Sequence, residues 1–178
     1  MLLKRIARTI VAIVIVGAGA VAIGAQPAWA DNGPLNSSHR AAIIGAASGR
    51  CLDVKNGDTA GNGARLQLWD CNGSYNQGFS NQSIYKINTT KWYTKCLDVV
   101  GGSGSDGALI QQYDCNYNAQ QDFSFVFVYN DGGHALYQIK TAFGKCLDAK
   151  NYGTANGTQI QQYSCFASHP KQQLWWVR

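Results

Sequence analysis

Three aspartates in this 178-residue chain each follow a Cys-Leu pair, and a glutamine and an aromatic residue lie 13 to 16 residues beyond each of them. The sets are Asp53 with Gln67 and Trp69, Asp98 with Gln111 and Tyr113, and Asp148 with Gln161 and Tyr163. Residues two apart on a strand point the same way, so each amide and ring would share a face. A carboxylate accepts hydrogen bonds from hydroxyls, an amide donates and accepts, and a ring offers a flat apolar surface. The pattern predicts binding of neutral, hydroxyl-rich ligands such as sugars.

These sets belong to a unit that the chain repeats three times. Residues 49–54 recur as 94–99 and 144–149, and in each copy a second cysteine follows the first by 19 or 20 residues. Eight residues before the second cysteine there is always a glycine, and five before it an aliphatic residue. A Gln-x-aromatic motif follows each copy: Gln77-Gly78-Phe79, Gln121-Asp122-Phe123 and Gln173-Leu174-Trp175. Chance does not match so many positions three times, so the chain is an internal triplication.

The six cysteines fall into three equivalent pairs, one in each repeat. The repeat predicts the disulfides Cys51–Cys71, Cys96–Cys115 and Cys146–Cys165. Each would close a loop of about 20 residues and stabilise the fold by about 3 kcal/mol on the loop-entropy model. Zinc sites place cysteines at short spacings such as Cys-x-x-Cys, which this chain lacks. We therefore expect neither a metal nor a cofactor.

The first 30 residues have the features of a secretory signal peptide. Lys4, Arg5 and Arg8 precede an apolar run over residues 10–25, and Ala28-Trp29-Ala30 supplies a small-x-small cleavage pattern. The run is shorter than the ~20 residues that span a bilayer. We expect cleavage after Ala30 and a secreted protein with no membrane insertion, a setting in which disulfides form.

Composition argues against several classes of function. Loss of the signal would leave 12 basic residues against 10 aspartates, a net charge of +2, with no basic cluster for a nucleic acid. The chain has no glutamate, which excludes the His-Glu-x-x-His peptidases. His39, His134 and His169 lie outside the repeated pattern. A glycosidase needs two carboxylates ~5–10 Å apart, whereas the matched aspartates would occupy separate sites. We expect a protein that is not an enzyme.

The elements that must position these residues are short strands. Segments such as 84–87, 123–128 and 137–140 are apolar or alternating and are separated by Gly, Asn and Asp turns. No amphipathic helical window follows the signal, so the fold class is all-β. Each repeat holds about four strands, and three copies can close a barrel without exposed edges. We place the repeats at residues 41–82, 83–132 and 133–178, after a flexible lead-in over residues 31–40.

The motifs Cys-Leu-Asp-Val, Gln-Leu-Trp-Asp-Cys and Gln-x-aromatic resemble those of the ricin-type lectin domain, a β-trefoil of about twelve short strands. The resemblance covers residues 41–178. Carried over repeat by repeat, it implies carbohydrate-binding residues Asp53, Gln67, Trp69, Asn76 and Gln77, then Asp98, Gln111, Tyr113, Gln120 and Gln121, then Asp148, Gln161, Tyr163, Gln172 and Gln173. Gln120 replaces the usual asparagine, and two extra residues follow Cys165 in the third repeat.

Structural roles for the same residues remain open at this stage. The aspartates could organise turns, the glutamines of Gln-x-aromatic could tie the repeats together, and the rings could pack in the core. The resemblance implies a secreted lectin that binds galactose- or xylose-type glycans or polysaccharides through up to three weak sites, with a separately encoded enzyme or toxin subunit as a further partner. The alternatives are a toxin- or adhesion-type attachment subunit and a trefoil protease inhibitor, which would use one protruding loop.

Overall fold

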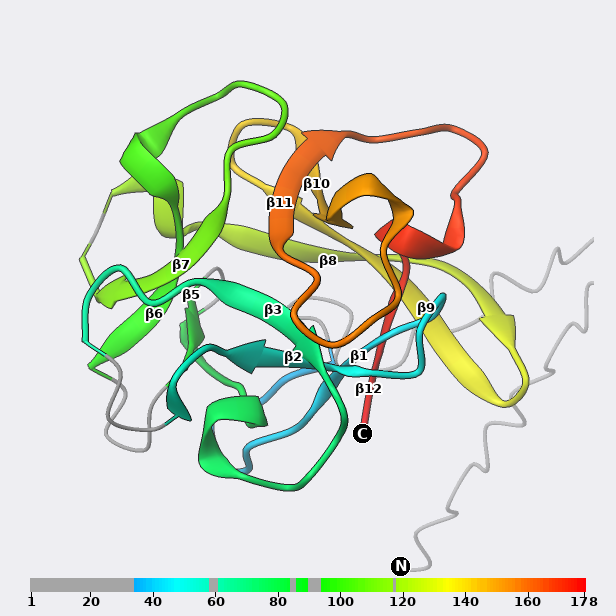
Figure 1. The fold of residues 1–178 in the computed structure, drawn as a ribbon, viewed down its shortest axis with the longest axis horizontal. Coiled ribbons are helices and arrows are strands. Elements are labelled where there is room, and N and C mark those ends of the chain that lie inside the picture. The colour runs from blue at the N-terminus through cyan, green and yellow to red at the C-terminus, as the bar shows by residue number, and fades with distance from the viewer. Residues whose placement is uncertain (1–33, 58–60, 84–85, 90–93, 117) are drawn as a thin grey trace, which may run out of the picture.

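The computed structural model of the protein describes residues 34–57, 61–83, 86–89, 94–116 and 118–178 (Figure 1). The predicted signal peptide and residues 31–33 of the lead-in lie outside the described residues. From the rest of the lead-in, Leu35 lies in the core, and the Arg40 guanidinium donates to the backbone carbonyls of Tyr75, Gly78 and Thr89. Among the described residues no helix is long and apolar enough to cross a membrane.

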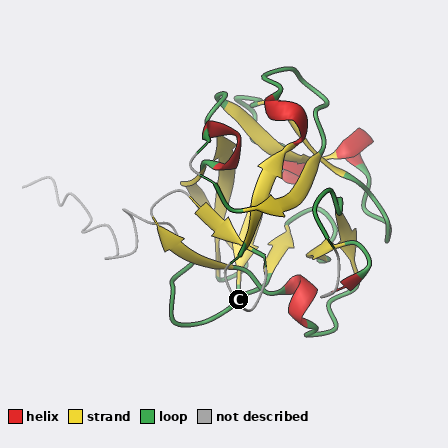
Figure 2. Ribbon diagram, turned by 90° about the vertical axis from the view of Figure 1, so that its left-hand side faces the viewer, coloured by secondary structure: helices red, strands yellow, loops and turns green. Residues whose placement is uncertain are grey.

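The described chain is built from strands and short 3-10 turns, which confirms the all-β prediction. The strands are β1 (Ile43–Gly45), β2 (Cys51–Val54), β3 (Leu66–Trp69), β4 (Ser80–Ser83), β5 (Lys86–Asn88), β6 (Lys95–Val99), β7 (Ile110–Asp114), β8 (Phe123–Asp131), β9 (His134–Thr141), β10 (Lys145–Ala149), β11 (Ile160–Ser164) and β12 (Trp175–Val177). The 3-10 turns are η2 (Tyr75–Gln77), η3 (Val100–Gly102), η4 (Ala119–Gln121), η5 (Lys150–Tyr152) and η6 (Lys171–Gln173). Figure 2 shows these short turns in red and the strands in yellow.

Six of the strands form a closed ring. The pairs β4–β5, β8–β9 and β12–β1 join one repeat to the next, and β12 is antiparallel to β1, so the two ends of the described chain meet. Within the third repeat β9 pairs with β12. In the other two repeats a single β-bridge joins the corresponding strands: Ala41 with Phe79 beside β1 and β4, and Lys86 of β5 with Asp122 beside β8. Each strand of the ring therefore pairs with a strand of another repeat. This agrees with the expectation that one repeat alone could not bury its apolar face.

The other six strands form three hairpins, β2–β3, β6–β7 and β10–β11, that hold the predicted chemical residues. Their registers are equivalent, with Asp53 opposite Gln67, Asp98 opposite Gln111 and Asp148 opposite Gln161. The turn in each hairpin hydrogen-bonds to the hairpin of the next repeat, and the third returns to the first. The Gly63 N–H donates to the Gln112 carbonyl at 2.9 Å, Gly107 to Gln162 at 2.8 Å, and Gly157 to Leu68 at 2.9 Å. The three hairpins therefore cover the ring as one interlocked layer.

The repeated glycine of these turns has a backbone reason. Gly63, Gly107 and Gly157 have φ angles of 87°, 85° and 85°, in the left-handed region where a side chain is disfavoured. The glycine found eight residues before each second cysteine is therefore needed for the turn that reaches the neighbouring repeat.

The core contains the apolar positions that the repeat predicts. Phe79, Phe123 and Trp175, from the three Gln-x-aromatic motifs, are buried with the aliphatic residues of the hairpins. The Trp175 indole N–H also donates to the Leu147 carbonyl at 3.1 Å, a hydrogen bond that phenylalanine cannot make in the other two repeats. All three predicted disulfides, Cys51–Cys71, Cys96–Cys115 and Cys146–Cys165, are present and confirm the pairing within repeats.

A polar contact links each repeat to the next beside these disulfides. Asn62 of the first repeat accepts a hydrogen bond from Lys95 and donates to Asp114 of the second, each at 2.7 Å. Between the second and third repeats the acid comes instead from the earlier repeat. Asp106 of the second repeat pairs with Lys145 of the third at 2.9 Å and accepts a hydrogen bond from the Ser164 hydroxyl at 2.8 Å. The Lys145 ammonium that donates to Asp106 holds the pKa of this carboxyl below its usual value.

Candidate functional site

Each hairpin presents a carboxylate held by a glutamine from the opposite strand. The Gln67 amide donates to the Asp53 carboxylate at 2.9 Å, Gln111 to Asp98 at 2.8 Å, and Gln161 to Asp148 at 2.8 Å. The three aspartates are only 3–4% exposed. An aspartate that merely shaped a turn would not need this cross-strand amide, so the repeated arrangement is a fixed polar group near the turn end of each hairpin.

The glutamine of each Gln-x-aromatic motif supports the same carboxylate from behind. The Gln77 amide donates both to the second Asp53 oxygen and to the Asp70 carbonyl, each at 3.0 Å, while its own oxygen accepts from the Asn72 N–H. Equivalent bonds, at 2.8–3.2 Å, join Gln121 to Asp98, Asp114 and Asn116, and Gln173 to Asp148, Ser164 and Phe166. These amides are 0–2% exposed, so they position the carboxylate and have little surface for a ligand.

The third predicted amide differs among the repeats. In the first, the Asn76 amide donates to Asp53 at 2.7 Å and to the Val54 carbonyl at 3.1 Å. In the second, the longer Gln120 side chain lies beside Gly102. In the third, Gln172 lines a pocket. Asp53 therefore accepts three amide hydrogen bonds, while two are described for Asp98 and two for Asp148.

The three rings predicted to face a ligand are at the surface. Trp69 and Tyr113 are each 41% exposed and Tyr163 is 36% exposed, although they belong to the same strands as the buried aliphatic residues. Strand alternation explains this, because each ring is two residues from the glutamine that meets the carboxylate. A carboxylate, an amide and an accessible ring thus occur together in all three repeats.

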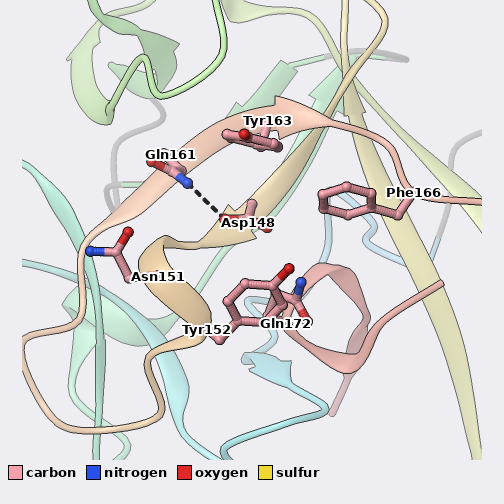
Figure 3. A pocket seen from close by; sticks show the side chains of 7 residues that line it. All are labelled: Asp148, Asn151, Tyr152, Gln161, Tyr163, Phe166 and Gln172. Carbon is pink, nitrogen blue, oxygen red and sulfur yellow. Dashed lines mark hydrogen bonds between the residues drawn. The ribbon is translucent and has the colours of Figure 1, made fainter. Parts of the chain in front are cut away.

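The third set lines a pocket with residues that the sequence pattern did not predict. Its walls include Asn151, Tyr152 and Phe166 together with Asp148, Gln161, Tyr163 and Gln172 (Figure 3). The Phe166 ring stacks on Tyr163, with ring centres 5.8 Å apart and an interplanar angle of 28°. One sequence signal pointed to Tyr152: the equivalent residues of the other repeats, four positions after the aspartate, are Gly57 and Gly102.

Burial affects the charge of the third carboxylate. Loss of solvation raises the pKa of Asp148, while the hydrogen bonds from Gln161 and Gln173 oppose that rise. At a pH well above this pKa the group is an anion inside the pocket, and its negative oxygens can accept hydroxyl donors.

The surroundings of the second carboxylate also differ from the others. The Arg65 guanidinium, from the first repeat, donates to the Gln111 oxygen at 2.6 Å. The equivalent residues next to the other two glutamines are Leu109 and Gln159, which form backbone bridges with Gln161 and Gln67. The three sites share their central residues and differ in the residue that the preceding repeat places beside them.

Comparison with known proteins relates this arrangement to a family. Residues 39–175 match the Ricin-type beta-trefoil lectin domain. The designed threefold-symmetric protein ThreeFoil is 29% identical, with a TM-score of 0.67 over 78% of this chain and 96% of its own. An exo-β-1,3-galactanase from Clostridium thermocellum is also 29% identical, with a TM-score of 0.69 over 82% of this chain, which spans only 31% of that enzyme.

A third solved structure shows the same fold at lower identity. The ricin B-like lectin of Macrolepiota procera, in complex with lactose, is 17% identical, with a TM-score of 0.62 over 79% of this chain and 96% of the lectin. Together with the strand ring and the three hairpins, these likenesses confirm the β-trefoil fold expected from the sequence. The chain belongs to the ricin-type β-trefoil lectin domain family.

Proposed function

We propose that the protein is a secreted lectin that binds galactose- or xylose-type glycans through up to three weak sites. The observation that carries this proposal is the threefold recurrence of a held carboxylate beside an exposed ring. A sugar bound there stacks its C–H face on Trp69, Tyr113 or Tyr163, while its hydroxyls donate to the carboxylate and exchange hydrogen bonds with the cross-strand glutamine.

The sugar class is supported by the relatives and by the chemistry of the sites. One relative is a β-1,3-galactanase and another is a lectin in complex with lactose. The carboxylates are held by uncharged amides, which suits neutral hydroxyl-bearing ligands. Secretion is supported by the three disulfides, since such bonds persist in oxidising compartments. The protein binds and does not cleave its glycan, because among the described residues each site offers one carboxylate where glycoside hydrolysis ordinarily uses two.

A glycan array and a polysaccharide pull-down with the protein beginning at Asp31 test this function. We expect retention on xylan or on galactose-containing polymers and signals for the matching oligosaccharides on the array. Competition by free xylose or galactose identifies the sugar. A protein that is folded by circular dichroism and yet shows no binding in either assay would refute the lectin proposal.

The buried Asp148 predicts a pH dependence for the third site. The ionised carboxylate accepts hydrogen bonds from ligand hydroxyls more strongly than the protonated acid does, and the pKa of Asp148 is raised above its ordinary value of 3.8 by burial. As the pH falls, binding at this site should therefore weaken with a midpoint above 3.8. Because the folded protein holds this proton more tightly than the unfolded chain, the same group makes the protein less stable as the pH rises from 3.8 through the raised pKa.

This pH dependence can be measured in the variant W69A/Y113A, which retains only the third ring. Titration of oligosaccharide binding from about pH 3 to about pH 7 gives the midpoint. The same variant with Asp148→Asn is the control, because its amide does not titrate. A midpoint at or below 3.8, or the same pH profile in the variant that carries Asp148→Asn, contradicts the prediction.

A further inference from the structure

The turn after each carboxylate strand begins with a shared backbone feature in all three repeats but carries different side chains. Two successive residues have positive φ: Asn56 and Gly57 in the first repeat, Gly101 and Gly102 in the second, Asn151 and Tyr152 in the third. The second of these positions is glycine twice, as the left-handed region favours. In the third repeat Tyr152 adopts it with a φ of 58°. An aromatic side chain is held there against its backbone preference.

Packing of the fold does not account for this tyrosine. Tyr152 is 69% exposed, the highest value among the large apolar and aromatic residues at the described surface, and it is not part of the core. Its ring instead lines the pocket of the third site. Figure 3 shows Tyr152 and Tyr163 on opposite sides of Asp148, with Phe166 at one end of the pocket and Asn151 at the other.

The two tyrosines come from different elements and differ in accessibility. Tyr163 lies on β11, two residues beyond Gln161, and stacks on Phe166. It lines the same pocket as Gln161 and Asp148, which are hydrogen-bonded to each other, so a sugar placed on Tyr163 would lie beside both polar groups. Tyr152 lies at the end of η5, on the other side of the carboxylate, with most of its ring facing solvent. That free ring surface lies beside the first sugar position and adds a second flat apolar surface to the same pocket.

We propose that the third site is an extended cleft that binds two consecutive sugar residues of a chain, one on Tyr163 beside Asp148 and the next on Tyr152. This inference rests on the proposed lectin function and assigns the third site a ligand class, internal or terminal oligosaccharide segments. The first and second sites have glycine in place of Tyr152 and hold a single residue on Trp69 or Tyr113.

The background for the test is W69A/Y113A, in which exposed rings are removed and the third site is left intact. Isothermal titration compares xylose with xylotetraose, and galactose with β-1,3-galactotriose, on this protein. The oligosaccharide should bind roughly 2- to 12-fold more tightly than its monosaccharide, the gain expected from one additional ring contact. Adding Tyr152→Gly, the residue present in the other repeats, should remove that preference.

Two further substitutions separate the ring from the backbone. Tyr152→Phe keeps a ring and should retain the preference for the oligosaccharide, whereas Tyr152→Leu keeps the strained backbone without a ring and should lose it. Tyr152→Gly should also leave the urea midpoint unchanged or raise it, because glycine suits the positive φ. Loss of affinity without loss of stability would identify a ligand contact.

The outcomes distinguish this inference from the lectin function itself. If Tyr152→Gly leaves the oligosaccharide preference intact, or if W69A/Y113A does not bind while the wild-type protein does, the extended cleft is wrong and the lectin function stands. If the folded wild-type protein binds no glycan at all, the lectin function fails first.

Discussion

Replacing Trp69, Tyr113 and Tyr163 together by alanine is expected to lower retention on a polysaccharide that the wild-type protein binds by about 10²–10⁴-fold. In the proposed function each ring supplies the stacking surface of one site, and simultaneous engagement of several weak sites makes binding to a repetitive polymer strong. The three rings are 36–41% exposed, so their removal leaves the core intact. Affinity electrophoresis in gels containing the polymer measures the effect for single, double and triple variants.

The pattern across this series is as informative as the final value. Single variants should lose part of the retention, and the largest loss should come when a second ring is removed, because multivalent binding then ends. Unfolding free energies should stay within about 0.5 kcal/mol of the wild-type value, as for other surface substitutions. Undiminished retention by a folded triple variant would show that these rings are not the binding surface.

Removing the Cys146–Cys165 disulfide by alanine substitution at both positions should reduce the free energy of unfolding by about 3 kcal/mol. The bond closes a loop with a sequence separation of 19 and joins β10 to the residue after β11. Its loss releases the unfolded chain from a constraint, which is the main source of the destabilisation. Urea unfolding of this variant and of the matching Cys96, Cys115 variant provides the comparison.

The same disulfide has a direct relation to the third site. Cys146 lies two residues before Asp148, and Cys165 two residues after Tyr163, so the bond joins the strand ends that position the carboxylate and the ring. Under conditions where the variant is folded, oligosaccharide binding should persist, because Gln161 and Gln173 still hold Asp148. A loss of stability below about 0.5 kcal/mol would argue that the unfolded chain is already constrained by other means.

Much of the fold followed from local and repeated features of the chain. The three disulfides could be predicted because each cysteine pair recurs at the same spacing. The shared face of Gln67 and Trp69 could be predicted because side chains alternate along a strand, whatever the strand packs against. The signal peptide and the sugar specificity stay predictions.

Other features depended on contacts between distant segments, which no local pattern encodes. Gln77 is a support for Asp53 because η2 packs behind the hairpin and buries the amide. Arg65 reaches Gln111 only because the first repeat lies against the second.

The chain by itself thus determined the threefold repeat, the cystines and the residue types of each site, since these depend on spacing and strand geometry. Tertiary structure alone decided which amides reach the carboxylate from the opposite strand and which support it from behind. It also placed Tyr152 across Asp148 from Tyr163, where its ring lines the pocket of the third site, because the turn after β10 comes close to β11 only in the folded chain.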